Sequence, residues 1–134
     1  MFKRRVVMLV AVVTLMAVMG AAVPSFATYY TTGEADGYML WTGDYDWYGV
    51  DLSSGVQYCV SVSVPWNADF EVKVYYDSNH DGYASDWECV GSGTRGTGED
   101  EYVYFTAHHS GRYHIKVYSY RGHGDYTIRL RRNY

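Results

Sequence analysis

The stretch that decides the fold reads Val56-Gln57-Tyr58-Cys59-Val60-Ser61-Val62-Ser63-Val64, and Pro65 follows it. Apolar and polar side chains alternate along this stretch. A period of two residues is typical of a β-strand with one buried and one wet face. Proline ends such a strand because it has no N–H to donate to the next strand. The stretch therefore predicts a strand whose valine and tyrosine side chains enter a core.

The same alternation recurs along most of the chain, and no apolar pattern of helical period is present. Shorter strands are expected near residues 38–42 and 87–90, which gives seven or eight strands in total. Because each strand has one apolar face, two sheets must cover each other. We therefore predict an all-β fold, an antiparallel β-sandwich. The other apolar sets expected in its core are Tyr48, Val50 and Leu52; Phe70, Val72, Val74 and Tyr76; Val103, Phe105 and Ala107; Tyr113, Ile115 and Val117; Tyr126, Ile128 and Leu130.

The N-terminal part of the sequence is typical of a secretory signal peptide. Lys3, Arg4 and Arg5 precede an apolar run, and Ser25-Phe26-Ala27 fits a small-x-small cleavage site. We expect residues 1–27 to be a cleaved signal peptide, 28–35 an N-terminal segment and 36–134 the sandwich domain. The alternative is an uncleaved anchor helix, since the run is close to spanning length. Cleavage would make the protein secreted, with no membrane segment left.

Charge is distributed unevenly along a chain whose formal net charge is −4. Residues 28–111 carry 14 acidic and two basic side chains, whereas residues 112–134 carry six basic and one acidic. An acidic domain of this kind is not typical of nucleic-acid-binding proteins, which present a large basic surface. The acidic part is better suited to binding cations.

The chain contains two cysteines, Cys59 and Cys89. Exported proteins meet an oxidising compartment, and an exposed free thiol is a liability there. We expect a Cys59–Cys89 disulfide, which would stabilise the fold by roughly 3–4 kcal/mol on the chain-entropy model. The alternative is two unpaired thiols on separate strands.

Residues 77–88 match the twelve-residue calcium loop pattern in full. Gly82 permits the sharp turn at position 6, and the carboxylates recur at the spacing that a hard, oxygen-seeking cation requires. The alternative is a polar hairpin tip without metal, because Asp, Asn and Gly also favour turns. The loop is not expected to lie between helices, since residues 70–76 alternate as a strand. The predicted calcium ligands are Asp77, Asn79, Asp81, Tyr83 through its carbonyl, Ser85 and Glu88.

The last two strands place basic and aromatic side chains at their outward positions. If these strands pair, they form one basic face for an anionic glycan, a cell-wall polymer or a protein fibre; the alternative is an ordinary solvated face. Tyrosine and arginine are favoured at binding surfaces. We find no Gly-x-Ser-x-Gly elbow and no histidine spacing typical of zinc, so we expect no enzymatic activity. The predicted ligand-binding residues are Arg112, His114, Lys116, Tyr118, Arg129 and Arg131.

Several strand-and-turn patterns, taken in order, resemble the bacterial pre-peptidase C-terminal (PPC) domain family, which is related to the clostridial collagen-binding modules. The resemblance covers roughly residues 36–131 and implies a jelly-roll-like β-sandwich that accompanies secreted proteases and other hydrolases. No catalytic domain precedes the match, so we expect a free-standing module or a partner acting in trans. The patterns are Asp44-x-Asp46-Trp47-Tyr48-x-Val50-x-Leu52, Asp69-Phe70-x-Val72-x-Val74-Tyr75-Tyr76-Asp77, Glu101-x-Val103-x-Phe105-x-Ala107, Ser110-Gly111-x-Tyr113-x-Ile115-x-Val117 and Gly122-x-Gly124-x-Tyr126-x-Ile128.

The resemblance also suggests a second calcium position, because the collagen-binding relatives bind calcium near their N-terminal linker. Its residues here would be Glu34, Asp36, Asp44 and Asp46; the alternative is a set of surface acids that keep a sheet edge soluble. The leading function is a secreted, calcium-stabilised, non-catalytic module for an extracellular polysaccharide, fibrous protein, surface or secreted enzyme. The alternatives are a self-associating structural subunit, with residues 28–32 adding to a neighbour's sheet, and a protease regulator acting in trans.

Overall fold

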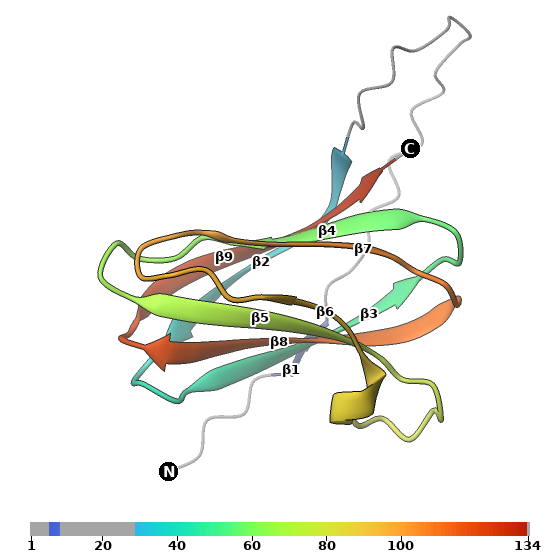
Figure 1. Ribbon diagram of the computed structural model, residues 1–134, viewed down its shortest axis with the longest axis horizontal. Coiled ribbons are helices and arrows are strands. Elements are labelled where there is room, and N and C mark those ends of the chain that lie inside the picture. Colours follow the sequence, from blue (N-terminus) through green and yellow to red (C-terminus); the bar gives the residue numbers. More distant parts are fainter. Residues whose placement is uncertain (1–5, 9–28, 134) are drawn as a thin grey trace, which may run out of the picture.

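Two β-sheets pack face to face in the computed structural model, which describes residues 6–8 and 29–133 (Figure 1). The first sheet, called sheet A, has the strand order β1-β3-β8-β5-β6, and sheet B has the order β2-β9-β4-β7. A short 3₁₀ helix, η1, lies between β5 and β6. The elements are β1 (Val6–Met8), β2 (Tyr29–Met39), β3 (Tyr45–Leu52), β4 (Gln57–Val62), β5 (Asp69–Tyr76), η1 (Asp86–Glu88), β6 (Cys89–Gly93), β7 (Glu101–Thr106), β8 (Gly111–Arg121) and β9 (Gly124–Asn133).

The chain changes sheet at almost every connection from β2 onward. Among the described strands, only β5 and β6 are consecutive strands of one sheet that pair with each other. The other antiparallel pairs join strands that are distant in sequence. The short β1 lies parallel to β3 at the edge of sheet A. The predicted all-β antiparallel sandwich is confirmed.

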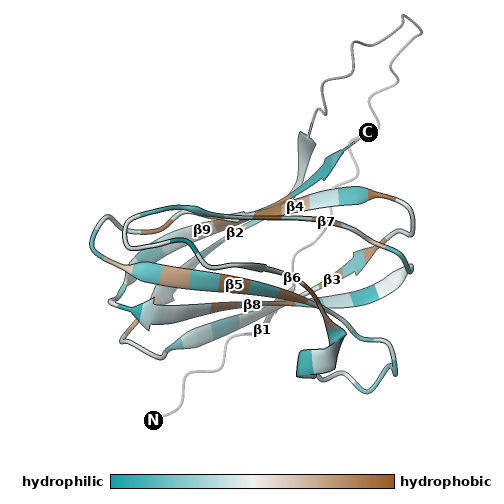
Figure 2. Ribbon diagram, viewed as in Figure 1, coloured by the Kyte–Doolittle hydropathy of each residue, from teal (hydrophilic) through white to brown (hydrophobic). Residues whose placement is uncertain are grey.

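Every apolar set expected from the alternation faces the space between the sheets. In Figure 2 this alternation appears as hydrophobic and hydrophilic bands that follow one another along single strands. The predicted valine and tyrosine positions of β4 are buried, and so are their counterparts on β3, β5, β7, β8 and β9. Alternate side chains point to opposite faces of a strand, so local sequence alone assigns the inner face.

A polar network lies inside this apolar core. Tyr126 donates its hydroxyl to Asp46 Oδ2 at 2.6 Å, and the Tyr48 hydroxyl lies 2.5 Å from that of Tyr126. Glycine is required at position 37, since a Cβ there would lie 2.1 Å from the Tyr126 ring. Burial, together with the bond to Asp46, raises the pKa of Tyr126 far above its ordinary value. The hydroxyl therefore stays protonated and acts as a fixed donor.

The first long strand differs from its prediction. β2 begins at Tyr29 and ends at Met39, whereas a strand at 38–42 was expected. Residues 29–35, expected to precede the domain, pair with β9 as part of sheet B. The segment considered for addition to a neighbouring molecule is thus already used within the chain. Apart from β1, the predicted signal peptide lies outside the described residues.

The predicted Cys59–Cys89 disulfide is wrong: both cysteines are free. Cys59 lies on β4 of sheet B, at an outward position beside Tyr104 and Arg131. Cys89 begins β6 of sheet A, opposite Tyr75, and is exposed. The two thiols are on different sheets and outside the shared core, so the sandwich itself separates them. Burial raises the pKa of the Cys59 thiol.

The link from β8 to β9 is only two residues long and passes from one sheet to the other. Gly122 has a φ of 85°, and a Cβ there would lie 3.1 Å from the Ala68 backbone. Only glycine combines this conformation with such a close approach. Within the described ranges, no helix is long and apolar enough to span a membrane.

Candidate functional site

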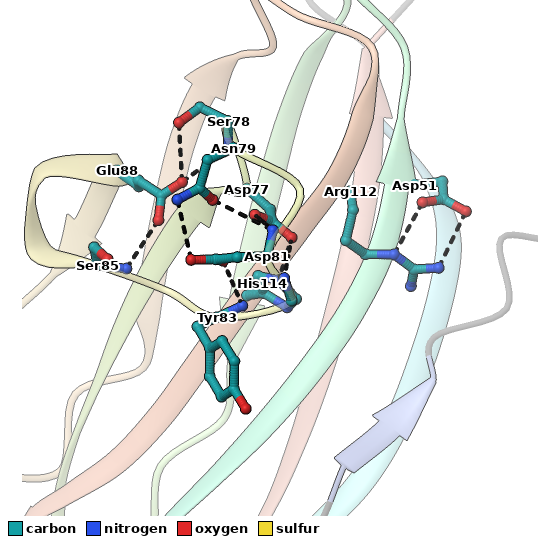
Figure 3. A network of polar contacts seen from close by, with 11 residues as sticks. Asp51, Asp77, Ser78, Asn79, Asp81, Tyr83, Ser85, Glu88, Arg112 and His114 are labelled. Atoms are coloured by element: carbon teal, nitrogen blue, oxygen red, sulfur yellow. Dashed lines mark hydrogen bonds and ion pairs between the residues drawn. The ribbon is translucent and has the colours of Figure 1, made fainter.

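The acidic loop 77–88 connects β5 to β6 at one end of sheet A (Figure 3). Asp77 follows the last residue of β5 directly, and Glu88 ends the 3₁₀ turn before β6. Both carboxylates are buried although the residues between them are largely exposed. The first and last positions of the predicted calcium loop therefore lie on the protein side, with the polar tip projecting outward.

Asp77 organises the first half of the loop. Its Oδ1 accepts the Asp81 N–H at 3.2 Å, and its Oδ2 accepts the Gly82 N–H at 3.0 Å. His114 Nε2, on β8, lies 3.4 Å from Oδ2. Burial raises the pKa of Asp77, but the hydrogen bonds from Gly82, His114 and Asp81 outweigh it, and the pKa lies below its ordinary value. Asp77 is thus held as a carboxylate.

Glu88 organises the second half of the loop. Its Oε2 accepts hydrogen bonds from the Ser78 N–H at 2.8 Å and the Ser78 hydroxyl at 3.0 Å, and its Oε1 accepts the Ser85 N–H at 3.0 Å. Burial acts to raise its pKa, yet these donors bring it below the ordinary value. Glu88 therefore holds both the start of the loop, at Ser78, and its end, at Ser85, by hydrogen bonds.

The side chains at the tip interact with each other. Asn79 Nδ2 donates to Asp81 Oδ2 at 3.0 Å, and Asp81 Oδ1 accepts the Tyr83 N–H at 2.8 Å. Carboxylate oxygens keep further lone pairs after accepting these bonds, so the donor set has the all-oxygen chemistry that calcium takes. As arranged here, no three His, Cys, Asp or Glu side chains among the described residues converge as metal ligands. A bound ion would therefore require the tip to close further.

The second acidic set does not come together. Glu34 and Asp36 lie on the outer face of sheet B, where Glu34 accepts from Arg129 at 2.8 Å and Asp36 accepts from the Thr127 hydroxyl at 2.8 Å. Asp44 accepts the N–H groups of Leu40 and Tyr45 in the β2–β3 turn, and Asp46 belongs to the core network. The expectation of one shared site is wrong, because alternate positions and a chain turn send these carboxylates apart.

The predicted basic face is also divided. Arg112, His114, Lys116 and Tyr118 lie on β8 of sheet A, whereas Arg129 and Arg131 lie on β9 of sheet B. Their outward sides are on opposite surfaces of the sandwich. The prediction assumed that β8 and β9 pair, and they do not; each pairs with strands from earlier in the chain.

The β8 half of that set belongs to a different surface, which we call the aromatic–lysine face. The Lys116 ammonium lies over three rings, 5.1 Å from the Tyr45 centroid and 5.5 Å from those of Trp47 and Tyr118. The Trp47 ring packs against Tyr75 at 5.7 Å. The loop contacts β8 through Asp77 and His114, and His114 lies two residues from Lys116 on that strand. Tyr83 projects outward from the loop (Figure 3). The face consists of Tyr45, Trp47, Lys73, Tyr75, Lys116 and Tyr118.

Sequence reasoning missed four of these residues, the ones contributed by β3 and β5. Their outward positions were visible in the alternation, since they follow or precede core residues by one. Nothing in the local sequence indicated that β3 and β5 flank β8. The missed residues are Tyr45, Trp47, Lys73 and Tyr75.

Solved structures of the same fold are found at low sequence identity. The pre-peptidase C-terminal domain of collagenase from Bacillus anthracis is 19% identical, with 96% of this chain and 95% of that chain covered and a TM-score of 0.56. PliG of Aeromonas hydrophila, a periplasmic inhibitor of g-type lysozyme, is 15% identical over 97% and 99%, also at 0.56. CorA of Methylomicrobium album BG8, a surface-associated copper-binding protein, is 10% identical over 74% and 92%, again at 0.56.

These similarities concern the fold alone. A search of curated proteins finds no significant match. The sequence model described as the bacterial pre-peptidase C-terminal domain, however, matches residues 44–119. The match runs from the turn after β2 through most of β8 and includes the acidic loop and every residue of the aromatic–lysine face. Because it covers more than half of the sequence, the chain belongs to the bacterial pre-peptidase C-terminal domain family.

Proposed function

We propose that this chain is a secreted, non-catalytic binding module that attaches to an extracellular polymer, surface or secreted enzyme. The observation that carries the proposal is the aromatic–lysine face, where three rings surround one ammonium group on an otherwise wet side of sheet A. Aromatic residues give a large contact area at low entropic cost, and they are enriched at binding surfaces. Family membership supports an accessory role for the module.

Calcium is the proposed stabiliser of the loop beside this face. The side chains of Asp77, Asn79 and Asp81 would supply oxygens, together with the Tyr83 carbonyl, Ser85 and Glu88. The amide hydrogen bonds to Asp77 and Glu88 support this proposal, because they hold two carboxylates ionised at the two ends of the loop. A divalent cation would offset the repulsion between these charges and rigidify the tip.

The polymer-binding proposal is tested by retention on insoluble collagen, cellulose, chitin and peptidoglycan. Wild type should be retained by at least one of these, and Trp47→Ala should weaken retention. Tyr104→Ala is the matched control, since Tyr104 is an exposed aromatic residue on sheet B. If Trp47→Ala and wild type are retained equally, the aromatic–lysine face is not the binding surface.

Calcium binding is tested by thermal unfolding. Binding to the folded state alone stabilises by about 2.7 kcal/mol at a hundredfold excess over Kd, so calcium should raise the melting temperature and chelator should lower it. Asp81→Ala should abolish most of this response, whereas Asp86→Ala, an exposed acid in the same loop, should keep it. An equal calcium response in Asp81→Ala and wild type would exclude this loop as the site.

A further inference from the structure

The outward side chains of β8 form a row of three basic residues, Arg112, His114 and Lys116. The first two each face an acid: Arg112 Nε lies 3.1 Å from Asp51 Oδ1, and His114 lies 3.4 Å from Asp77. Lys116 differs, because no ion pair joins it to an acid within the described part of the chain, and its ammonium contacts aromatic rings instead. The positive charge at this point of the face is left without a matching acid.

A second lysine lies directly opposite. Lys73 on β5 is the Cα partner of Lys116 on β8, and both are outward residues of sheet A. Like charges directly opposite each other on neighbouring strands are destabilising. Glu71, two residues along β5 on the same side, accepts the hydroxyl of Tyr118. Glu71 also interacts electrostatically with Lys73, so the centre of the face carries two positive charges and one negative charge, although the whole chain is acidic.

The rings around Lys116 also restrict its motion. A lysine side chain in water samples many rotamers, and ordering it on binding costs free energy. Here cation–π contacts from Tyr45, Trp47 and Tyr118 hold the ammonium in place before any ligand arrives. An anion placed between Lys73 and Lys116 would meet one donor, Lys116, that is already ordered, and it would offset the positive charge of both lysines.

We infer that the aromatic–lysine face binds an acidic polysaccharide, with a sugar carboxylate between Lys73 and Lys116 and the sugar rings against the neighbouring aromatic side chains. The inference rests on the proposed function and specifies its ligand. Aromatic rings pack against sugar faces, whereas a small free anion would gain nothing from them. A duplex nucleic acid is disfavoured, because its charge density of about one phosphate per 1.7 Å is repelled by the acidic remainder of the surface more strongly than a chain with one carboxylate per sugar.

The test uses polygalacturonate and its fully methyl-esterified form, which has the same backbone without the charge. We expect the acid form to bind and the ester to bind at least about tenfold more weakly. Lys73→Gln and Lys116→Gln should each weaken binding of the acid form by about tenfold. Arg129→Gln, a basic residue on the opposite surface, should bind like wild type. Lys73→Gln should keep the wild-type melting temperature or exceed it, since it removes a like-charge contact.

Equal binding of the acid and the ester would overturn the inference, and so would unchanged binding by Lys73→Gln. A third such result is retention by a neutral polymer through Trp47 with neither form of polygalacturonate bound; this leaves the proposed function standing and shows that its ligand is not acidic. If no polymer is retained, acidic or neutral, the proposed function itself fails.

Discussion

The two connections that flank the edge strand β6 are each fastened by a buried glutamate, and they differ in how completely that glutamate is satisfied. Glu88, in the acidic loop before β6, is 4% exposed, and its two oxygens accept three hydrogen bonds. Glu101, at the end of the 94–100 crossover after β6, is 0% exposed and accepts one, from the Arg95 N–H at 2.6 Å. Both connections are thus held by a buried glutamate, but the Glu88 carboxylate has more hydrogen-bond donors than that of Glu101.

The difference appears in the opposite directions of the two pKa shifts. Burial raises the pKa of both groups, but in Glu88 the donors from Ser78 and Ser85 reverse the effect and the pKa falls below its ordinary value. In Glu101 burial dominates over the single donor, Asp69 and Glu71 add repulsion, and the pKa rises to about 7. Its Oε2 has no hydrogen-bond partner within the described residues. The donors therefore outweigh burial at Glu88, and burial outweighs the single donor at Glu101.

The largest effect is expected from Glu88→Ala. The substitution leaves the amide groups of Ser78 and Ser85 without their acceptor and releases both arms of the loop. The melting temperature at pH 7 should fall by on the order of 10 °C, measured by circular dichroism. Asp86→Ala, which removes an exposed acid two residues away, should change it little. A fall of the same size in both variants would mean that charge, not the hydrogen bonds of Glu88, stabilises the loop.

Glu101→Gln should stabilise the protein, and only at high pH. Because the folded-state pKa of Glu101 is raised, the stability it contributes is present below about pH 4.5 and is lost as pH rises through about 7. Above that pH the wild type holds a buried charge that the amide lacks. Denaturant unfolding should show the variant more stable by about 2 kcal/mol at pH 9 and nearly equal to wild type at pH 4. A difference independent of pH would contradict the raised pKa.

Ser78→Ala should have the opposite pH dependence to Glu101→Gln, because its effect on the free energy of unfolding is present at high pH and lost at low pH. The effect should also be smaller, because only one donor is removed. Ser78→Ala deletes the hydroxyl that donates to Glu88 but keeps the amide bond. The free energy of unfolding at pH 7 should decrease by about 1 kcal/mol. The loss should shrink as pH falls below 4, because protonated Glu88 no longer gains from charge-assisted bonds. Ser92→Ala on the exposed side of β6 serves as the control.

The smallest change in melting temperature is expected from altering Cys89, the first residue of β6. Since Cys59 and Cys89 are not bonded, adding dithiothreitol should leave the melting temperature unchanged, and Cys89→Ser should be nearly neutral. In native protein, Ellman's reagent should react with Cys89 and leave the buried Cys59 protected. A fall in stability on reduction would show that the two thiols are linked.

Much of this fold follows from local sequence. The alternation at Val56–Val64 and in the other apolar sets fixed which side chains enter the core, because successive residues of a strand point to opposite faces whatever the strand pairs with. The spacing of acids at 77–88 likewise marked a polar loop, and both of its end residues are buried carboxylates held by backbone amides. These features depend on the order of residues within one strand and on contacts within one loop, between residues three to ten apart.

Tertiary structure alone decided which strands lie side by side. The short Gly122–His123 link favoured a hairpin, yet β8 and β9 belong to opposite sheets, and the predicted basic face is divided between them. For the same reason Cys59 and Cys89 lie on different sheets, Asp46 bonds to a core tyrosine, and Lys73 faces Lys116. Strand pairing is a contact between residues far apart in sequence, and its free energy comes from packing two sheets together. Alternation within one strand therefore specifies a face but not a neighbour.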